Sequence, residues 1–371
     1  MIYLNNSATS FPKPDCVVRA VEEALLSPPY DAGRGSVCGE DVTAVCRRAI
    51  AELLGVRDER VFFTSGATES FNMLLRGLPM AGKKICISCY EHNALAKPLY
   101  ALADRDNIRV LMPDSDGTIG MDAWKAAAEE ADYVFVNHCS NETGHVQDIR
   151  AIAELCRRHD ALCICDLSQS AGMIPIELAE WGVDAAVFTG HKALFGPTGT
   201  GGFYLRGGLE LECPKWGGTG RNGGSVFPTE PGAGHHEVGT QNLHGLAGLA
   251  AGTRFVLDCG VENVLEKVRE DSRRLISALK KLDGVRLYTT APESNIVCFN
   301  FSGLLPADSA YILGDLYGVV VRAGYHCAPL LAGIVGEGSG SVRVSVSWLT
   351  PSEDIDAFIA AAAEISRSLK K

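Results

Sequence analysis

In ADYVFVNHCSNETGHVQDIRAIAELCRRHDALCICDLS (residues 131–168), a short apolar run, an amphipathic run and a second short apolar run follow one another. The amphipathic run, DIRAIAELCRRHD, has the three- and four-residue apolar spacing of a helix. Strand, helix and strand in this order predict parallel strands joined by a helical crossover. Both flanking runs are apolar throughout, which is typical of strands that are buried on both faces of a sheet.

The same alternation extends on both sides of this stretch. Further strand-like runs are RVFFTSG (60–66), KKICISC (83–89), IRVLMPD (108–114) and DAAVFTGH (184–191), and MDAWKAAAEEA (121–131) is helix-like. From about Leu246 to Leu282 the spacing predicts one long helical region, which Asp283-Gly284 ends with a turn. Strands such as SNIVCFNF (294–301) and SVRVSVSW (341–348) and the helix-like SEDIDAFIAAAAEISRSL (352–369) follow. The sequence therefore predicts a large α/β domain and a smaller α+β domain.

One segment interrupts this order. Residues 217–242, GGTGRNGGSVFPTEPGAGHHEVGTQN, are rich in glycine and lack apolar periodicity. Such a segment is either a mobile linker or a functional loop that wraps a site.

Composition excludes several classes of protein. The 371 residues are 46% hydrophobic and 21% charged, which is ordinary globular composition with material for about two domains. The formal net charge of −11 and the lack of a basic run argue against binding to nucleic acid. No signal peptide and no apolar run of about 18 residues is evident, so we expect a cytoplasmic protein without a membrane span.

The thirteen cysteines require an explanation. An odd number in a cytosolic chain favours free thiols over a disulfide framework. Cys86-x2-Cys89 and Cys163-x-Cys165 resemble fragments of a zinc site, but both lie in apolar runs, where cysteine acts as a small core residue. We therefore expect no metal site.

Three signals at strand ends carry chemistry. Thr64–Ser70 (TSGATES) follows a strand and precedes a helix, where small residues let backbone N–H groups approach an anion. Asp166 and Lys192 each follow a buried strand, the place where open α/β sheets bind ligands. Taken singly, the three are equally consistent with an N-cap, a helix cap and a solvated turn lysine. Taken together, they are the phosphate anchor, the pyridinium partner and the Schiff-base lysine that pyridoxal 5′-phosphate (PLP) requires.

A series of motifs resembles one known family. They are YLNNSATSFPKP (3–14), SGATES (65–70), EHNA (91–94), SNETG (140–144), DLSQS (166–170), TGHKALFGPTGTGG (189–202), HHEVGTQN (235–242), RAGYHCA (322–328) and SVRVS (341–345). In order and spacing, the chain resembles the class V aminotransferase group of fold-type I PLP enzymes, in its cysteine desulfurase and selenocysteine lyase branch. The resemblance implies a large domain (16–250) with a mostly parallel seven-stranded sheet flanked by helices. It also implies a small C-terminal domain (251–371), against which residues 1–15 pack.

The resemblance also implies roles in binding the cofactor. Lys192 would form the Schiff base, Asp166 would pair with the pyridinium nitrogen, and His92 would stack on the ring and help to move protons. Gln169 would contact the phenolic oxygen of the ring. The phosphate would be held by Ala67, Thr68, Thr189 and His191. Gly239-Thr240 matches a motif that reaches the phosphate of a partner subunit, which implies a homodimer with shared active sites.

Two further residues would bind the substrate. Asn141 would lie near the ring oxygen and the substrate, and Arg343 would clamp the substrate carboxylate, a task suited to a guanidinium. Ordinary interpretations remain open: Arg343 as a solvent-facing charge in an alternating strand, His92 as a core histidine, and Asn141 and Gln169 as turn residues. His235 and His236 are interpreted as loop residues.

Cys327 decides the type of reaction. In desulfurases with a similar motif, this cysteine attacks the sulfur of the substrate, becomes a persulfide and releases alanine. The attack requires a thiolate, and Arg322 and His326 are near enough in sequence to contribute to its surroundings. Arg322 would also bind the substrate. Cys327 could instead be one more buried thiol. The family motif more often has histidine where Tyr325 stands, which leaves the substrate and the sulfur acceptor open.

The predicted function is a PLP-dependent cysteine desulfurase that converts L-cysteine to L-alanine. A protein sulfur acceptor is possible. The alternatives are a selenocysteine lyase acting on L-selenocysteine, a cysteine or cystine C–S lyase, and a class V aminotransferase. A non-catalytic sulfur carrier on the same fold is disfavoured by the complete lysine, carboxylate and phosphate set.

Overall fold

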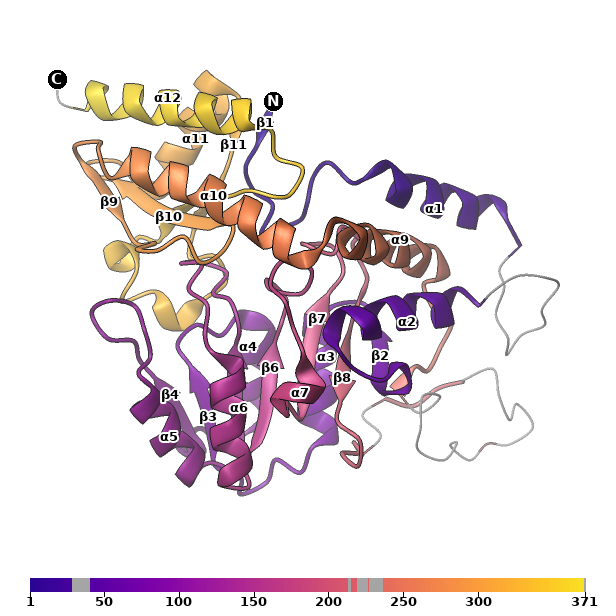
Figure 1. The fold of residues 1–371 in the computed structure, drawn as a ribbon. Coiled ribbons are helices and arrows are strands. Elements are labelled where there is room, and N and C mark those ends of the chain that lie inside the picture. Colours follow the sequence, from indigo (N-terminus) through magenta and orange to yellow (C-terminus); the bar gives the residue numbers. More distant parts are fainter. Residues whose placement is uncertain (29–40, 213–214, 219–225, 227–235, 370–371) are drawn as a thin grey trace.

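The large domain is built on a seven-stranded sheet. The structure, a computed structural model, describes residues 1–28, 41–212, 215–218, 226 and 236–369 (Figure 1). The strand order is β2 (Val61–Thr64), β8 (Gly201–Leu205), β7 (Ala185–Thr189), β6 (Leu162–Asp166), β5 (Tyr133–Asn137), β3 (Ile85–Ser88) and β4 (Ile108–Leu111). Strand β8 runs antiparallel to both of its neighbours, and the pairs from β7 to β4 are all parallel. The expected mostly parallel sheet of seven strands is confirmed.

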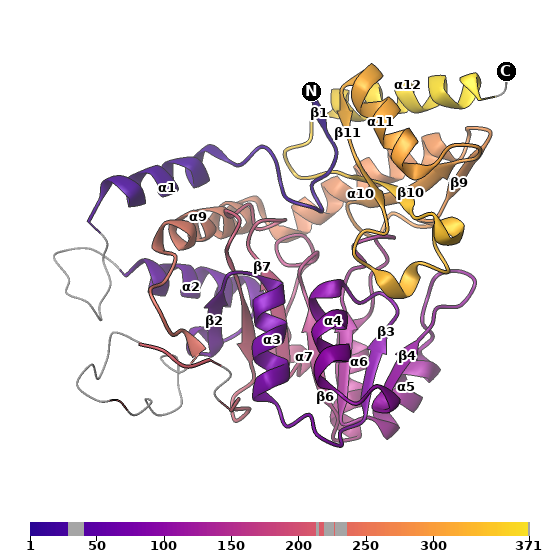
Figure 2. The same cartoon turned by 180° about the vertical axis from the view of Figure 1, so that it is seen from behind.

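Helices cover both faces of this sheet. Figure 2 shows α3 (Ala67–Gly77) and α4 (Asn93–Leu102) on one face, and Figure 1 shows α5 (Met121–Glu130), α6 (Ile149–Arg158) and α7 (Leu178–Trp181) on the other. Short 3-10 helices, η1 (Asp58–Arg60) and η2 (Arg105–Asn107), precede β2 and β4. Across the described ranges, no helix is both long and apolar enough to cross a membrane.

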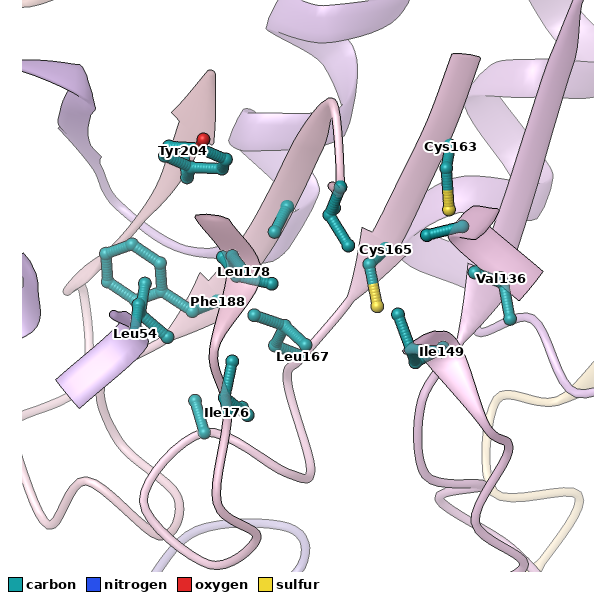
Figure 3. Packing of buried hydrophobic residues seen from close by; sticks show 14 of the residues in the cluster. Leu54, Val136, Ile149, Cys163, Cys165, Leu167, Ile176, Leu178, Phe188 and Tyr204 are labelled. Atoms are coloured by element: carbon teal, nitrogen blue, oxygen red, sulfur yellow. The ribbon is translucent and has the colours of Figure 1, made fainter. Parts of the chain in front are cut away.

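The cysteine spacing is explained by the pleat of the strands. Cys163 and Cys165 point from β6 into the same apolar cluster, while Ile164 between them packs on the opposite face. Figure 3 shows both thiols among neighbours that include Val136 and Ile149. The eleven cysteines in the described part of the chain are free thiols, and most are buried. Cys38 and Cys213 lie outside the described residues.

The small domain contains a four-stranded antiparallel sheet. Its order is β12 (Arg322–Gly324), β13 (Ser341–Ser345), β10 (Ile296–Phe301) and β9 (Val285–Leu287). It packs with α10 (Val261–Leu279), α11 (Pro306–Tyr317) and α12 (Ser352–Ser368), and η3 (Pro329–Leu331) and η4 (Gly336–Gly338) lie between β12 and β13. Strand β1 (Ile2–Tyr3) pairs with β11 (Val319–Val320), and Asn5 forms a bridge with Ser345.

The expected helical region from about Leu246 to Leu282 is present, but it is divided into two helices. Two helices, α9 (Leu243–Cys259) and α10, meet at Gly260, whose φ of 80° breaks the helical path. Helix α9 packs on α1 (Asp15–Leu26) and α2 (Val42–Leu54), whereas α10 runs along the small sheet (Figure 1). The expected division at residue 250 falls inside α9. A division at Gly260 fits these contacts better. The expected turn is present at Gly284, with φ of 72°.

Candidate active site

A cavity of about 320 Å³ lies at the carboxyl ends of the large sheet. Strands β2, β5, β6 and β7 end at its wall, because parallel strands present their carboxyl ends at one edge. Its lining includes the predicted residues Ala67, Thr68, His92, Asn141, Asp166, Gln169, Thr189, His191, Lys192, Arg322 and Arg343. The small domain supplies the two arginines, so the cavity lies where the domains meet.

The turn between β2 and α3 forms one wall of the cavity. Gly66 caps α3 with φ of 149°, a conformation that L side chains rarely adopt. Gly201 of β8 packs so closely that an added Cβ would lie 2.6 Å from the Gly66 Cα atom. The helix N-terminus therefore presents its backbone N–H groups beside Ala67 and Thr68, an arrangement that favours an anion. Beside it, Glu69 accepts hydrogen bonds from the Ser65 backbone N–H and hydroxyl group, both at 2.7 Å.

Asp166 and Lys192 bring opposite charges to the cavity. Burial raises the pKa of Asp166, and hydrogen bonding by Ser168 and Asn137 and the charge of Lys192 oppose this. Burial lowers the pKa of Lys192 to about 8; Asp166 opposes the shift, and Arg343 and Arg322 add to it. A lysine whose pKa lies near neutrality has the unprotonated amine that carbonyl chemistry requires.

The N-terminal segment holds the peptide that leads into Lys192. The His191 carbonyl oxygen accepts hydrogen bonds from Ser10 N at 3.0 Å, Thr9 Oγ1 at 3.1 Å, Ser10 Oγ at 3.2 Å and Lys13 Nζ at 3.1 Å. Lys13 Nζ also donates to the Gly196 carbonyl oxygen at 2.8 Å. Sequence reasoning missed this role of Lys13. The FPKP motif includes Lys13, but the motif does not indicate which atoms Lys13 contacts.

His92 presents a neutral ring to the cavity. As the N-cap of α4, its Nδ1 accepts a hydrogen bond from Ala94 N at 3.0 Å, so the proton of the neutral ring is on Nε2. Burial, with Lys192 and the two arginines, lowers the pKa of His92 to about 3. Gln169 uses its amide nitrogen to donate to the Ser7 carbonyl oxygen at 3.0 Å.

Arg343 is fully buried, which excludes its interpretation as a solvent-facing charge. Its Nη1 donates to the Asn141 carbonyl oxygen at 2.5 Å and its Nη2 to Asn5 Oδ1 at 3.3 Å. Burial and the charge of Arg322 lower its pKa to about 9, so Arg343 remains charged at neutral pH. Among the described residues, these two neutral oxygens accept hydrogen bonds from the guanidinium, and Glu142 acts on it only through its charge. A buried cation held in this way favours an anion in the cavity.

Cys327 is partly exposed, so it is not simply another buried core thiol. It is absent from the cavity lining in the described residues but lies next to it, because Arg322 lines the cavity and donates from Nη2 to Cys327 Sγ at 3.2 Å. Asn141 Nδ2 donates to the His326 carbonyl oxygen at 2.6 Å. Two cavity residues thus contact the turn that bears the thiol.

Two residues of the HHEVGTQN motif lie apart from this cavity. Thr240 is exposed and lines a neighbouring cavity with Ser65 and Glu69. His236 is buried against the rings of Phe62 and Phe203, a packing role that its interpretation as a loop residue did not include. His235, and most of the 217–242 segment, lie outside the described residues.

Glu91 is a further site-related residue that the sequence did not reveal. Its Oε1 accepts hydrogen bonds from Ser88 Oγ at 2.7 Å and from Asn137 N at 2.8 Å. It is fully buried, and burial raises its pKa to about 8. Glu91 therefore stays largely protonated at neutral pH and supports Asn137, which lines the cavity.

Comparisons with known proteins agree with this geometry. The family model for class V aminotransferases matches residues 2–358. A probable cysteine desulfurase of Xylella fastidiosa is 31% identical over the full chain and 92% of that protein. The solved apo structure of a cysteine desulfurase from Thermococcus onnurineus superposes with a TM-score of 0.89 at 28% identity, covering 99% of this chain and 95% of that one. A cystine C–S lyase, C-DES, has a TM-score of 0.82 over 98% of this chain and 97% of its own, at 23% identity, which shows the fold alone. The chain belongs to the class V aminotransferase family.

Proposed function

We propose that the cavity binds PLP and that the protein is a cysteine desulfurase. The residues present fit this cofactor, because four buried polar atoms of the cavity lining have no hydrogen-bond partner among the described residues. These atoms are Asn137 Oδ1, Asn141 Oδ1, His191 Nδ1 and Arg343 Nε. Buried polar groups are normally satisfied, so such a set favours a polar ligand.

Each part of the cofactor has a matching group. Lys192 would bind it covalently, Asp166 would pair with its ring nitrogen, and His92 would lie against the ring. The start of α3, with Ala67 and Thr68, and the residues Thr189 and His191 would hold its phosphate. Gln169 would contact its phenolic oxygen. When bound, PLP supplies an electron sink for the pair released at the substrate Cα.

One observation carries the desulfurase proposal: Arg322 lines the cavity of Lys192 and also contacts the Cys327 thiol. A guanidinium at hydrogen-bond distance stabilises the thiolate, which is the nucleophile. Arg343, with Asn141 beside it, would bind the carboxylate of L-cysteine and direct its sulfur toward Cys327. Lys192, with a pKa of about 8, would accept the Cα proton.

The sulfur transfer balances as follows. The Cys327 thiolate attacks the substrate sulfur, and an S–S bond forms while the substrate Cβ–S bond breaks. The electron pair of the broken bond stays with the carbon fragment, which takes up a proton and leaves as L-alanine. The enzyme retains the sulfur as a Cys327 persulfide, which a thiol reductant or a protein acceptor reduces.

Product analysis tests the proposal. The holoenzyme is incubated with L-cysteine and dithiothreitol, and alanine, sulfide, pyruvate and ammonia are measured. We expect alanine and sulfide in equal amounts from the wild type and none from Cys327→Ala, with Cys16→Ala, an exposed cysteine, as the matched control. Pyruvate and ammonia would instead identify a C–S lyase. Parallel assays with L-selenocysteine distinguish a selenocysteine lyase by their kcat/KM.

We also propose a homodimer in which Thr240 of one subunit completes the site of the other. In support, Thr240 is exposed and lies outside the cavity of its own Lys192. Helices α1, α2 and α9 line a largely apolar cavity of about 610 Å³, and Leu26 at the end of α1 is 88% exposed. Mixed dimers of Lys192→Ala and Thr240→Val test it: one site per mixed dimer would be intact, so mixing should raise the activity above that of either variant.

The free thiols are consistent with a reducing compartment, and we propose the cytoplasm. A protein that accepts the persulfide sulfur is the expected partner. Transfer of labelled sulfur from Cys327 to a candidate acceptor, followed by mass spectrometry, tests this.

A further inference from the structure

Cys327 lies in a tight turn with an unfavourable backbone. Ala328 N donates to the Tyr325 carbonyl oxygen at 2.9 Å, which closes a four-residue turn around His326 and Cys327. Both central residues have positive φ, 49° for His326 and 61° for Cys327. Turns with positive φ at both central positions favour Asn-Gly, because L side chains other than Asn and Asp resist this conformation. Two such residues in succession at a functional position require strong external support.

The backbone of the turn receives part of this support. The His326 carbonyl oxygen accepts from Asn141 Nδ2 at 2.6 Å, and the Cys327 carbonyl oxygen accepts from Asn93 N at 2.8 Å. Both donors belong to segments of the large domain that border the cavity. These two bonds fix where the turn sits.

The side chain of His326 supplies the rest from the opposite side. Its ring is buried, with Nε2 at 2.9 Å from the Ser341 carbonyl oxygen and 3.1 Å from Ser341 Oγ. Ser341 Oγ donates its own proton to Glu142 Oε1 at 3.0 Å. Both Ser341 oxygens therefore act as acceptors toward the ring, and Nε2 must carry the proton. Burial and the charge of Arg343 lower the pKa of His326 to about 3, so the ring is neutral.

We propose that His326 is a positioning residue for the sulfur transfer, and this rests on the proposed function of Cys327. Its neutral ring donates from Nε2 to Ser341 and ties the strained turn to β13. In this position the thiol lies 3.2 Å from the guanidinium of Arg322. We assign His326 no proton exchange with the substrate, because Nε2 is bound to Ser341 and His326 is not part of the cavity lining. Its Nδ1 has no hydrogen-bond partner among the described residues, and the pH profile below tests this nitrogen.

Two substitutions separate positioning from acid–base chemistry. His326→Gln keeps an amide N–H where Nε2 lies and cannot titrate, whereas His326→Leu removes the donor at similar volume. Ser341→Ala removes one of the two acceptors and preserves the backbone one. His159→Leu, the same change at an exposed histidine, is the matched control. The cofactor absorption band and thermal melting confirm that each variant is folded and loaded.

The readouts are the kcat and KM for L-cysteine, the pH profile of kcat, and the alkylation rate of Cys327 by iodoacetamide at pH 7. Alkylation is followed by peptide mapping, because other cysteines also react. For His326→Leu we expect kcat to fall at least about ten-fold, since a displacement near 1 Å is enough, with KM within about two-fold. The kcat of His326→Gln should lie within about three-fold of the wild-type value, with an unchanged pH profile. The kcat of Ser341→Ala should lie between those of His326→Leu and His326→Gln.

Alkylation tests the turn without the reaction. Moving the thiol away from Arg322 removes the cation beside its sulfur, so the Cys327 thiol should alkylate more slowly in His326→Leu and at the wild-type rate in His326→Gln. The proposal is overturned if His326→Leu retains wild-type kcat and alkylation. It is also overturned if His326→Gln is as impaired as His326→Leu, since the ring would then be needed for its own chemistry. Should the wild type form no alanine, the desulfurase assignment fails, while slowed alkylation in His326→Leu would still support the role in holding the turn.

Discussion

Arg322 and Arg343 are Cα partners across the neighbouring antiparallel strands β12 and β13. Like charges directly opposite one another destabilise a sheet. This pair also lines the cavity, where burial and then the charge of Arg322 lower the pKa of Arg343. The pairing is understandable if the two guanidiniums have different tasks, with Arg343 binding the substrate carboxylate and Arg322 contacting the Cys327 thiol.

The first prediction follows from this division. Arg343→Lys keeps the charge but loses the planar fork that binds a carboxylate through two bonds. We expect the loss of about 2 kcal/mol, which raises the KM for L-cysteine roughly thirty-fold in steady-state alanine assays. Arg109→Lys, an exposed arginine on β4, should leave the KM unchanged. An unchanged KM in Arg343→Lys would rule out this role.

The second prediction concerns Lys13. Lys13→Met removes the donor to the carbonyl oxygens of His191 and Gly196, on either side of Lys192. Without this donor, the loop around Lys192 must become ordered when PLP binds. We therefore expect binding of PLP to be weaker by about 1.4 kcal/mol, which is a ten-fold higher Kd in equilibrium dialysis. Lys125→Met on the exposed face of α5 is the control. Equal affinities for Lys13→Met and the wild type would contradict it.

The third prediction separates stability from function at Asp166. Its folded pKa is raised, so this acid contributes stability at acid pH that is lost as the pH rises through its unfolded and then its folded pKa. Asp166→Asn removes that cost, and at pH 8 the apoprotein should gain about 1–2 kcal/mol of unfolding free energy in urea. Activity should fall about a hundred-fold or more, because the variant lacks the carboxylate proposed to pair with the PLP ring nitrogen. The control is Asp122→Asn at an exposed position. If the Asp166→Asn apoprotein is less stable than the wild type, the prediction about stability is wrong.

The fourth prediction concerns pH dependence and Glu91. With a folded pKa of about 8 against an ordinary 4.5, the folded protein keeps this proton while the unfolded chain loses it. The apoprotein should therefore lose stability between about pH 4.5 and pH 8, by roughly 4 kcal/mol from this residue. In Glu91→Gln, whose amide oxygen still accepts from Ser88 and Asn137, that slope should flatten. Urea titrations at pH 5, 6.5 and 8 measure the dependence of the unfolding free energy on pH. If this dependence is as steep in Glu91→Gln as in the wild type, the prediction is wrong.

Local pattern predicted the large domain well, because strands buried on both faces read as unbroken apolar runs. The same reasoning failed where one sequence pattern is compatible with two different local structures. In SVRVS the alternation suits an exposed face, yet all five residues of β13 are buried, because serine is small and Arg343 finds acceptors in Asn141 and Asn5. Gly260 was hidden for a similar reason: helical periodicity continues on both sides of it, and only the positive φ shows the break.

The supporting contacts of the site could not be predicted at all. His326 meets Ser341, Lys13 meets His191, and Glu91 meets Asn137 only after the chain has folded, and no spacing rule joins these positions. Family motifs indicated which residues line the cavity. They did not indicate which residues hold those residues in place.

The pairing of the N-terminal segment has a consequence for the order of assembly during synthesis. Asn6 donates to the Ser345 carbonyl oxygen, 339 residues further along the chain. A few residues later, Ser10 N donates to the His191 carbonyl oxygen in the loop of Lys192. A domain that emerges early from the ribosome usually folds early. Here the large domain would wait for residues 319–345 before its N-terminal segment, and with it the lysine loop, could settle. A ribosome-bound nascent chain would thus be unable to order the lysine loop until residues 319–345 have emerged.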